Sequence, residues 1–202
     1  EEHLDSIDFN FKSKNGLTIF TAIINNYCFK SKNNDNNETH SKYFEINKYI
    51  SNLVKFLCDN GADLNIPDNN GNYPFELCLK YYDQNSIISY FTHSLCDSKK
   101  IDFSTKIYDR LLTESYTTYL HLAMRINSSI IEKLIKDKSI DINITDSFNE
   151  TPLMAACRSK KNRIIQLLFQ RDDLDYLHRN NEGKDALMIY YNSNEQTEAI
   201  QD

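Results

Sequence analysis

The distribution of apolar positions along the chain follows a two-part pattern that is clearest between residues 151 and 169. The first part, Thr151 to Cys157, combines a threonine and a proline with small residues, and the second, Ile164 to Phe169, carries bulky apolar residues at helical spacing. Threonine can cap free backbone N–H groups and proline is tolerated at the first helical position, so Thr151 and Pro152 predict a helix start. The pattern therefore predicts a thin inner helix, a tight turn and a thick outer helix, a unit that cannot bury its apolar faces alone.

Copies of this unit recur along the chain. The inner pattern starts again at Thr118 and at Asp185, each about 33 residues from Thr151, a spacing typical of helical repeats. Two earlier copies start at Thr18 and Tyr73, and each is separated from the next copy by a longer interval, so insertions interrupt the early units. Bulky runs that predict the outer helices lie at residues 52–57, 87–91, 130–135 and 164–169. Self-similarity of this kind indicates a repeat architecture.

The two insertions differ in composition. Residues 27–47 are rich in Asn, Lys and Ser and predict a polar loop between the helices of the first unit, with an end from Tyr43 to Ile50 that is compatible with a longer outer helix. Residues 94–116 carry enough apolar side chains, among them Ile107 and Leu111, for a short extra helix. Regular stacking is therefore least expected around residues 94–116.

The units are joined by polar turns, and these complete a resemblance to a known family. Asp68-Asn69-Asn70-Gly71 places a glycine where a positive φ is needed, and Asn149 takes that position in the fourth unit because asparagine tolerates the left-handed region. With Leu120-His121-Leu122-Ala123, Thr151-Pro152-Leu153 and the regular period of the later units, the sequence resembles the ankyrin repeat family.

The resemblance implies an all-α ankyrin-repeat solenoid, built of helix-turn-helix repeats with projecting turns. It implies a single array over residues 1–202, with about four full repeats plus partial ends. In this family the histidine that corresponds to His121 braces one turn against the next, so a structural role is expected for it. The implied function is a non-catalytic protein–protein interaction module, an adaptor or scaffold, which binds its partner on the concave groove and turn tips. The alternative is the substrate-recruiting region of a larger enzyme, of a ubiquitin-ligase-type assembly or of a secreted effector.

One candidate binding surface is a row of cations. Lys80, Arg125 and Arg158 follow the inner pattern in three consecutive units, and the resemblance places this row in the concave groove. The row indicates a cationic stripe for an acidic protein or peptide, although ankyrin repeats often carry Lys or Arg at this position. Tyr81 and Ile126 occupy the adjacent row.

The turn tips supply the remaining candidates. Phe148 stands at a tip, where an aromatic side chain has no structural reason to be, and exposed aromatics beside arginines are typical binding anchors. The alternative is that Phe148 folds back onto the neighbouring irregular turn at Tyr116. The other partner-binding candidates at the tips are Asn69, Asn72, Tyr116 and Glu150.

The composition indicates a globular protein and argues against membrane spans and nucleic-acid partners. The hydrophobic content of 40% and charged content of 26% are typical of a globular chain, and no apolar run is long enough to predict a membrane span. The net charge of −6 argues against general nucleic-acid binding. Five cysteines without a C-x-x-C pair predict reduced, mostly buried thiols in a cytoplasmic protein, with secretion as an effector left open. We expect a monomer.

Catalytic chemistry is not expected. Cys78 and Cys157 occupy small inner-helix positions without a paired histidine at a recognisable spacing, so they are predicted to be packing residues. Residues 172–175, Asp-Asp-Leu-Asp, lack the loop and the bidentate glutamate of a calcium site. The sequence therefore predicts no enzyme activity, no metal and no cofactor.

Overall fold

The helix start predicted at Thr151 is present in the computed structural model. Thr151 has extended backbone angles, φ −88° and ψ 162°, and its hydroxyl oxygen accepts a hydrogen bond from the Met154 N–H at 3.4 Å. Pro152 occupies the first helical turn. The structure describes residues 7–31, 40–82, 86–108, 115–125 and 129–198, and of these the side chains of 27–31, 40–47, 86, 87, 90, 125, 129 and 193–198 are left aside. The chain forms two compact units, Glu1–Asp102 and Phe103–Asp202, which are described separately.

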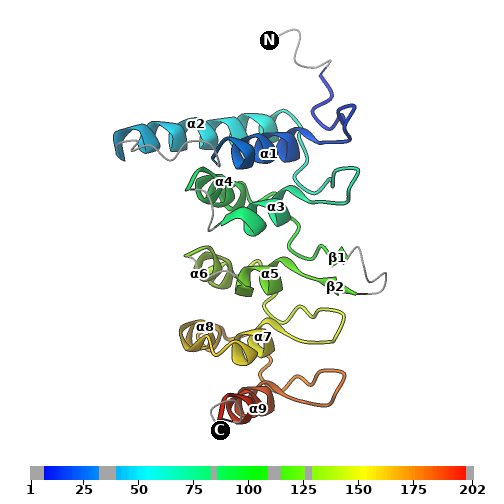
Figure 1. Cartoon of the computed structure of the whole chain (residues 1–202), viewed down its shortest axis with the longest axis vertical. Helices are drawn as coiled ribbons and strands as arrows, with labels where there is room; N and C mark the ends of the chain where they lie inside the picture. Colours follow the sequence, from blue (N-terminus) through cyan, green and yellow to red (C-terminus); the bar gives the residue numbers. More distant parts are fainter. Residues whose placement is uncertain (1–6, 32–39, 83–85, 109–114, 126–128, 199–202) are drawn as a thin grey trace. The chain divides into compact units, whose positions relative to one another are not determined.

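The first unit contains two helical hairpins. α1 (Ile19–Ser31) packs on α3 (Pro74–Tyr81), and α2 (His40–Asp59) packs on α4 (Ser86–Asp97), so inner and outer helices form separate layers (Figure 1). The core between them includes Phe20 and Phe91, both fully buried, with ring centroids 6.5 Å apart in an edge-on arrangement. The turn at Asp68 ties the two hairpins together, since the Asn69 N–H donates to the Gly16 carbonyl at 2.9 Å.

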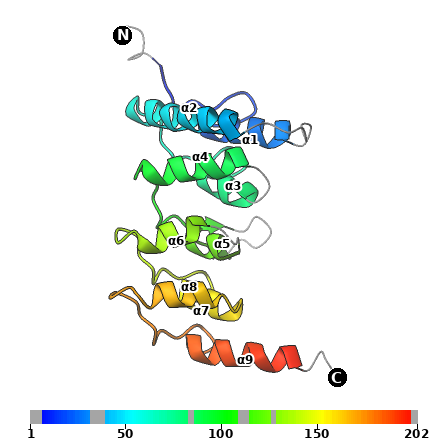
Figure 2. The ribbon, with the colours of Figure 1, turned by 90° about the vertical axis from the view of Figure 1, so that its left-hand side faces the viewer.

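The second unit continues the same plan. Inner helices α5 (Tyr119–Arg125), α7 (Pro152–Arg158) and α9 (Ala186–Glu198) pack in sequence, and outer helices α6 (Ser129–Lys136) and α8 (Asn162–Leu168) pack on each other (Figure 2). Two short antiparallel strands, β1 (Ile107–Tyr108) and β2 (Tyr116–Thr117), precede α5 and pair Ile107 with Thr117. The all-α prediction is therefore confirmed apart from these strands.

Both ends of the range 27–47, which was predicted as a polar loop, are helical, and the longer outer helix that the sequence allowed over residues 43–50 is confirmed. α1 continues to Ser31 and α2 already begins at His40, so the ends of this range are helical. Helix α2 extends this far back because Tyr43, Ile46 and Ile50 continue the helical spacing of Val54. Residues 32–39 lie outside the described part of the chain.

The prediction of an extra helix in residues 94–116 is also wrong for the part that the structure describes. The range begins inside α4, and its later described residues form a loop and the two strands. Ile107 is 6% exposed between exposed Lys106 and Tyr108, and this period-two alternation fits a strand. Leu111 lies outside the described residues. A single array over residues 1–202 stays a prediction.

The left-handed turn position predicted for Asn149 is confirmed, since its φ is 58°. Asn149 donates from its backbone N–H to the Asp146 carbonyl at 3.0 Å and from its side chain to the Arg179 carbonyl at 3.0 Å. Asparagine thus combines the required φ with a hydrogen bond that glycine could not make. Within the described residues, no helix is both long and apolar enough to cross a membrane.

Candidate functional site

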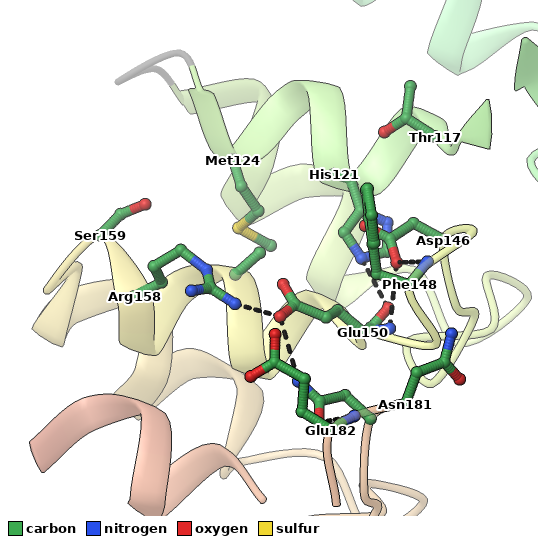
Figure 3. A pocket seen from close by; sticks show the side chains of 12 residues that line it. Thr117, His121, Met124, Asp146, Phe148, Glu150, Arg158, Ser159, Asn181 and Glu182 are labelled. Atoms are coloured by element: carbon green, nitrogen blue, oxygen red, sulfur yellow. Dashed lines mark hydrogen bonds and ion pairs between the residues drawn. The ribbon is translucent and has the colours of Figure 1, made fainter. Parts of the chain in front are cut away.

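A groove of about 430 Å³ lies in the second unit, between the inner helices and the turn tips (Figure 3). Its floor comes from α5 and α7, and its wall comes from the turns at Asp146 and Asn180. The lining residues are Thr117, His121, Met124, Asp146, Phe148, Glu150, Ala155, Arg158, Ser159, Asn180, Asn181 and Glu182.

Each turn in the wall is closed by the side chain of its first residue. Asp146 Oδ1 accepts the N–H groups of Phe148 at 2.9 Å and of Glu150 at 3.0 Å. Asn180 Oδ1 does the same for Glu182 at 3.0 Å and Lys184 at 2.9 Å. Aspartate and asparagine favour such turns because their short side chains reach the backbone two residues on. The tips are therefore preorganised.

Neighbouring tips are also bonded to each other through the backbone. The Ser147 N–H donates to the Tyr116 carbonyl at 3.1 Å, and the Asn181 N–H donates to the Phe148 carbonyl at 3.2 Å. The backbone of Phe148 is thus held from both sides, within its own turn and from the next one. A rigid backbone lowers the entropy lost when a partner docks on its side chain.

His121 fixes the floor of the groove to its wall, in the bracing role that the family resemblance implied. Its Nδ1 lies 2.8 Å from Thr118 Oγ1, and its Nε2 lies 2.9 Å from the Glu150 carbonyl oxygen, in the turn of the next repeat. A carbonyl only accepts, so Nε2 carries the hydrogen, and in the neutral ring Nδ1 accepts from the threonine hydroxyl. Burial lowers the pKa of His121 below its ordinary value, against smaller opposing effects of the Asp146 carboxylate and the Glu150 backbone. The ring is a structural brace.

Phe148 is the exposed aromatic of the groove. Its side chain is 60% exposed, whereas Met124 and His121 in the same lining are almost fully buried. The Tyr116 ring, onto which Phe148 was alternatively expected to fold, instead lies 5.9 Å from the Tyr108 ring, with Lys106 Nζ 4.3 Å from its centroid. The exposure of Phe148 favours its role as an anchor.

The polar centre of the groove is an ion pair that Figure 3 shows from close by. The Arg158 guanidinium of α7 points at the Glu150 carboxylate, and Asn180 Nδ2 lies 3.2 Å from the same carboxylate oxygen. The Glu150 side chain is 13% exposed and the Arg158 side chain 56%. Glu150 is therefore held in place, and Arg158 keeps half of its surface open to a ligand.

Of the predicted cation row, the groove lining contains Arg158, which lies among carboxylates, while the side chain of Arg125 lies outside the described residues. Asp146, Glu150 and Glu182 contribute carboxylates, and Arg158 is paired with one of them. Glu182 in turn pairs with Lys184 at 2.6 Å, and this hydrogen bond lowers the pKa of its carboxyl. The positive charge of Arg158 is therefore largely compensated here.

Five of the other predicted binding residues are described outside the groove lining. Asn69, Asn72, Lys80 and Tyr81 belong to the first unit, where Asn72 Nδ2 donates to Asp68 Oδ2 at 2.9 Å and the exposed Lys80 Nζ lies 5.8 Å from the Tyr81 ring centroid. Tyr116 contributes its carbonyl to the turn contact described above. The side chain of Arg125 and the whole of Ile126 lie outside the described residues. Of the ten candidates, the structure brings together Phe148, Glu150 and Arg158.

Several lining residues were not predicted. The repeat register alone could have found two of them, because the alignment of Thr151 with Asp185 also aligns Ser147 and Phe148 with Asn181 and Glu182. Asp146 and Asn180 were not predicted as groove residues. Met124 follows the inner pattern and carries no separate sequence signal for a groove.

The cysteines and the acidic segment outside the groove have contacts typical of structural residues. Cys58, Cys78, Cys96 and Cys157 are buried thiols, and burial raises the pKa of the Cys157 thiol to about 11. In the Asp172–Asp175 segment, Asp173 pairs with Arg171 at 2.7 Å. Among the described residues, no group of three His, Cys, Asp or Glu side chains is arranged to hold a metal ion.

The stacked hairpins, the bonded turns and the groove between them define a helical repeat protein. Residues 115–200 match the family model of ankyrin repeats in three copies. Together with the fold, this match over residues 115–200 supports an ankyrin repeat protein. The repeats of this family are generally protein–protein interaction modules.

Comparison with solved structures supports the fold. A chain from the complex of a predatory endopeptidase from Bdellovibrio bacteriovorus with an immunity protein superposes with a TM-score of 0.60 at 19% sequence identity. The match covers 95% of the present chain and 82% of the other. In all, 332 chains of solved structures match, so the fold is widespread and does not by itself specify a partner. A search of curated proteins found no match.

Proposed function

We propose that the chain is a non-catalytic adaptor that binds a partner protein or peptide in the groove of the second unit and on its turn tips. The observation that carries this proposal is Phe148, a large aromatic that stays 60% exposed on a turn whose backbone is bonded from both sides. Exposed aromatics on rigid backbones are the residues that dominate binding free energies in protein interfaces.

The polar centre supplies specificity in this proposal. Arg158 and Glu150 lie beside Phe148 in the lining, and both retain surface that a ligand can contact. A partner that packs an apolar side chain on Phe148 buries the exposed ring. Hydrogen bonds to the Arg158–Glu150 pair then set its orientation.

The charges of the groove indicate which charges a partner segment should carry. An acidic partner was expected from the cation row, but three carboxylates line the groove against one guanidinium. We therefore propose a partner segment of mixed character, with an apolar anchor residue and at least one hydrogen-bond donor or cation that faces Glu150 or Glu182. Electrostatic complementarity of this kind contributes to specificity more than to affinity.

The free chain is proposed to act as a monomer in the cytoplasm, without nucleic acid or membrane as a partner. The cysteines whose side chains the structure describes are thiols in the interior, which suits a reducing compartment. The net charge of −6 is unfavourable for binding a phosphate backbone.

The test is crosslinking with mass spectrometry on partners captured by the chain, followed by affinity measurement with the purified partner. Phe148→Ser is expected to weaken binding by roughly tenfold or more, as truncation of a central aromatic anchor does. Phe169→Ser is the matched control, since Phe169 is 58% exposed but does not line the groove. A partner whose affinity is equal for the parent chain and Phe148→Ser would contradict the proposal.

A further inference from the structure

Phe148 and Glu182 occupy equivalent positions on neighbouring turn tips, and both line the groove (Figure 3). The Phe148 N–H donates to the Asp146 side chain at 2.9 Å. In the next turn, the Glu182 N–H donates to the Asn180 side chain at 3.0 Å. The two tips are linked because the Asn181 N–H donates to the Phe148 carbonyl at 3.2 Å. The groove thus presents an exposed aromatic ring and an exposed carboxylate on adjacent, bonded tips.

The carboxylate of Glu182 is the most open of the three acidic groups in the lining. Its side chain is 67% exposed, whereas the Glu150 side chain is 13% exposed and already holds Arg158. Asp146 accepts the backbone N–H groups of its own turn. The partner of Glu182 is Lys184, whose side chain is itself 43% exposed. An ion pair between two exposed side chains is weak, so the Glu182 carboxylate is accessible to a competing cation.

The preceding tip shows that this chain places a cation on an aromatic ring. Lys106 Nζ lies 4.3 Å from the centroid of the Tyr116 ring, and the Tyr116 carbonyl accepts the N–H of Ser147, which precedes Phe148. Among the residues that the structure describes, no lysine or arginine lies over the Phe148 ring in this way. The face of an aromatic ring is electron-rich and attracts a cation. Phe148 therefore offers the same contact to a cation from outside the chain.

We propose that the groove binds an arginine side chain of the partner, which stacks on the Phe148 ring and directs its guanidinium at the Glu182 carboxylate. A guanidinium is flat and always charged, so it stacks on an aromatic face and donates two parallel hydrogen bonds to a carboxylate. Its methylene stem adds apolar contact along the ring. The arginine is thus the cation that the proposed partner segment requires.

The charges around this site favour an arginine over an acidic residue. The carboxylates of Asp146, Glu150 and Glu182 outnumber the cations Arg158 and Lys184. Arg158 is paired with Glu150, so its charge is compensated within the groove. The hydrogen bond from Lys184 lowers the pKa of the Glu182 carboxyl, which keeps it charged at neutral pH. Electrostatic complementarity of this kind selects among partners.

The arginine site rests on the function proposed above, because it specifies one residue of the partner segment. A titration with a short peptide needs no captured partner, so the two can fail separately. A captured partner that depends on Phe148, beside an arginine peptide that does not bind, would remove the arginine site and leave the function. A captured partner that is insensitive to Phe148→Ser, beside an arginine peptide that binds as expected, would contradict the function and leave the arginine site.

The probe is the tripeptide Ac-Gly-Arg-Gly-amide, titrated into the isotopically labelled intact chain and followed by NMR through the backbone amide shifts of the two turn tips. We expect saturable shifts with a dissociation constant on the order of 1–10 mM, which suits a single side-chain anchor. Ac-Gly-Lys-Gly-amide is expected to bind about threefold more weakly or worse, because an ammonium neither stacks flat on the ring nor bonds both carboxylate oxygens in parallel.

Two variants of the groove separate the contacts. Phe148→Ser and Glu182→Gln are each expected to weaken binding of the arginine peptide by about threefold or more, since each removes one of its two contacts. Phe169→Ser and Asp172→Asn are the matched controls, because both side chains are exposed and neither lines the groove. The NMR spectrum of each variant verifies that it is folded.

Absence of saturable shifts with the arginine peptide at up to about 20 mM, beyond the weak end of specific recognition, would overturn the inference. Equal affinity of the arginine and lysine peptides would do the same, and so would parent-like affinity of either groove variant. Tighter binding of Ac-Gly-Glu-Gly-amide than of the arginine peptide would also overturn it, because Arg158 rather than Glu182 would then select the partner.

Discussion

His121 Nε2 lies 2.9 Å from the carbonyl oxygen of Glu150 and thereby joins the inner helix of one repeat to the turn of the next. The same residue whose carbonyl receives this bond directs its side chain into the groove, where it holds Arg158. This contact therefore contributes both to the packing of the repeats and to the shape of the groove. A change at His121 is expected to alter both stability and groove geometry.

Replacement of His121 by leucine is expected to destabilise the chain by about 1–3 kcal/mol, because the Glu150 carbonyl and the Thr118 hydroxyl lose their buried partner. The measurement is urea unfolding followed by circular dichroism. Thr118→Val removes the Nδ1 contact alone, and the double variant shows whether the two bonds act together. If these variants unfold at the same urea concentration as the parent chain, the His121 side chain does not stabilise the fold.

The pH dependence of stability follows from the same ring. Burial holds the pKa of His121 below its value in the unfolded chain, so the unfolded state takes up the proton first as the pH falls. The contribution of His121 is fully present above the unfolded pKa of about 6.5 and is lost as the pH falls below it. Urea midpoints between pH 8 and pH 5 should therefore decline more steeply for the parent chain than for His121→Leu. Parallel declines would contradict this assignment.

Replacement of the buried Arg171 is expected to lower the free energy of unfolding strongly for a charged residue of the second unit. Its buried guanidinium holds three backbone carbonyls, and Arg171→Met leaves them without a donor, at a cost of roughly 2–4 kcal/mol. The ion pair with Asp173 adds little to this figure, because the Asp173 side chain is 55% exposed and solvent screens its charge. Arg163, with a side chain 78% exposed and paired to Glu132, provides the control. Arg163→Met should change the free energy of unfolding by less than about 1 kcal/mol in the same urea experiment.

The buried cysteines are expected to be unreactive in the folded chain. Burial raises the pKa of the Cys157 thiol to about 11, so almost no thiolate is present at pH 8. A Cys28→Ser background leaves Cys58, Cys78, Cys96 and Cys157, and these should react with Ellman's reagent only after denaturation. Rapid reaction of a stoichiometric thiol under native conditions would show that one of them is accessible.

Local signals predicted much of this structure from the sequence. Thr151, Pro152 and Asn149 act through their own backbone neighbourhoods, so their roles could be deduced without tertiary information. The brace at His121 came from family resemblance, since nothing local indicates a partner in the next repeat. Phe148 was predicted because an aromatic at a turn tip contradicts the usual composition of turns.

Long-range pairing explains what could not be predicted. Arg158 was expected to provide free positive charge, but the chain path brings Glu150 within ion-pair distance. The strand pair of Ile107 and Thr117 depends on the pairing of two short segments, neither of which predicts a strand alone. Exposure of Phe169 and Leu187 likewise depends on which helices follow in space, and the apolar pattern of these residues resembles that of a core.

Photo-crosslinking from position 148 tests the central proposal most directly. Phe148 is replaced by p-benzoylphenylalanine, which keeps an aromatic side chain at the turn tip, and the same replacement at Phe169 serves as the comparison. We expect the partner to be crosslinked from position 148, with the modified peptide in the partner carrying an apolar residue next to a polar or basic one. A partner that is held by the chain in solution but crosslinks only from position 169, or from neither position, would contradict binding in the groove.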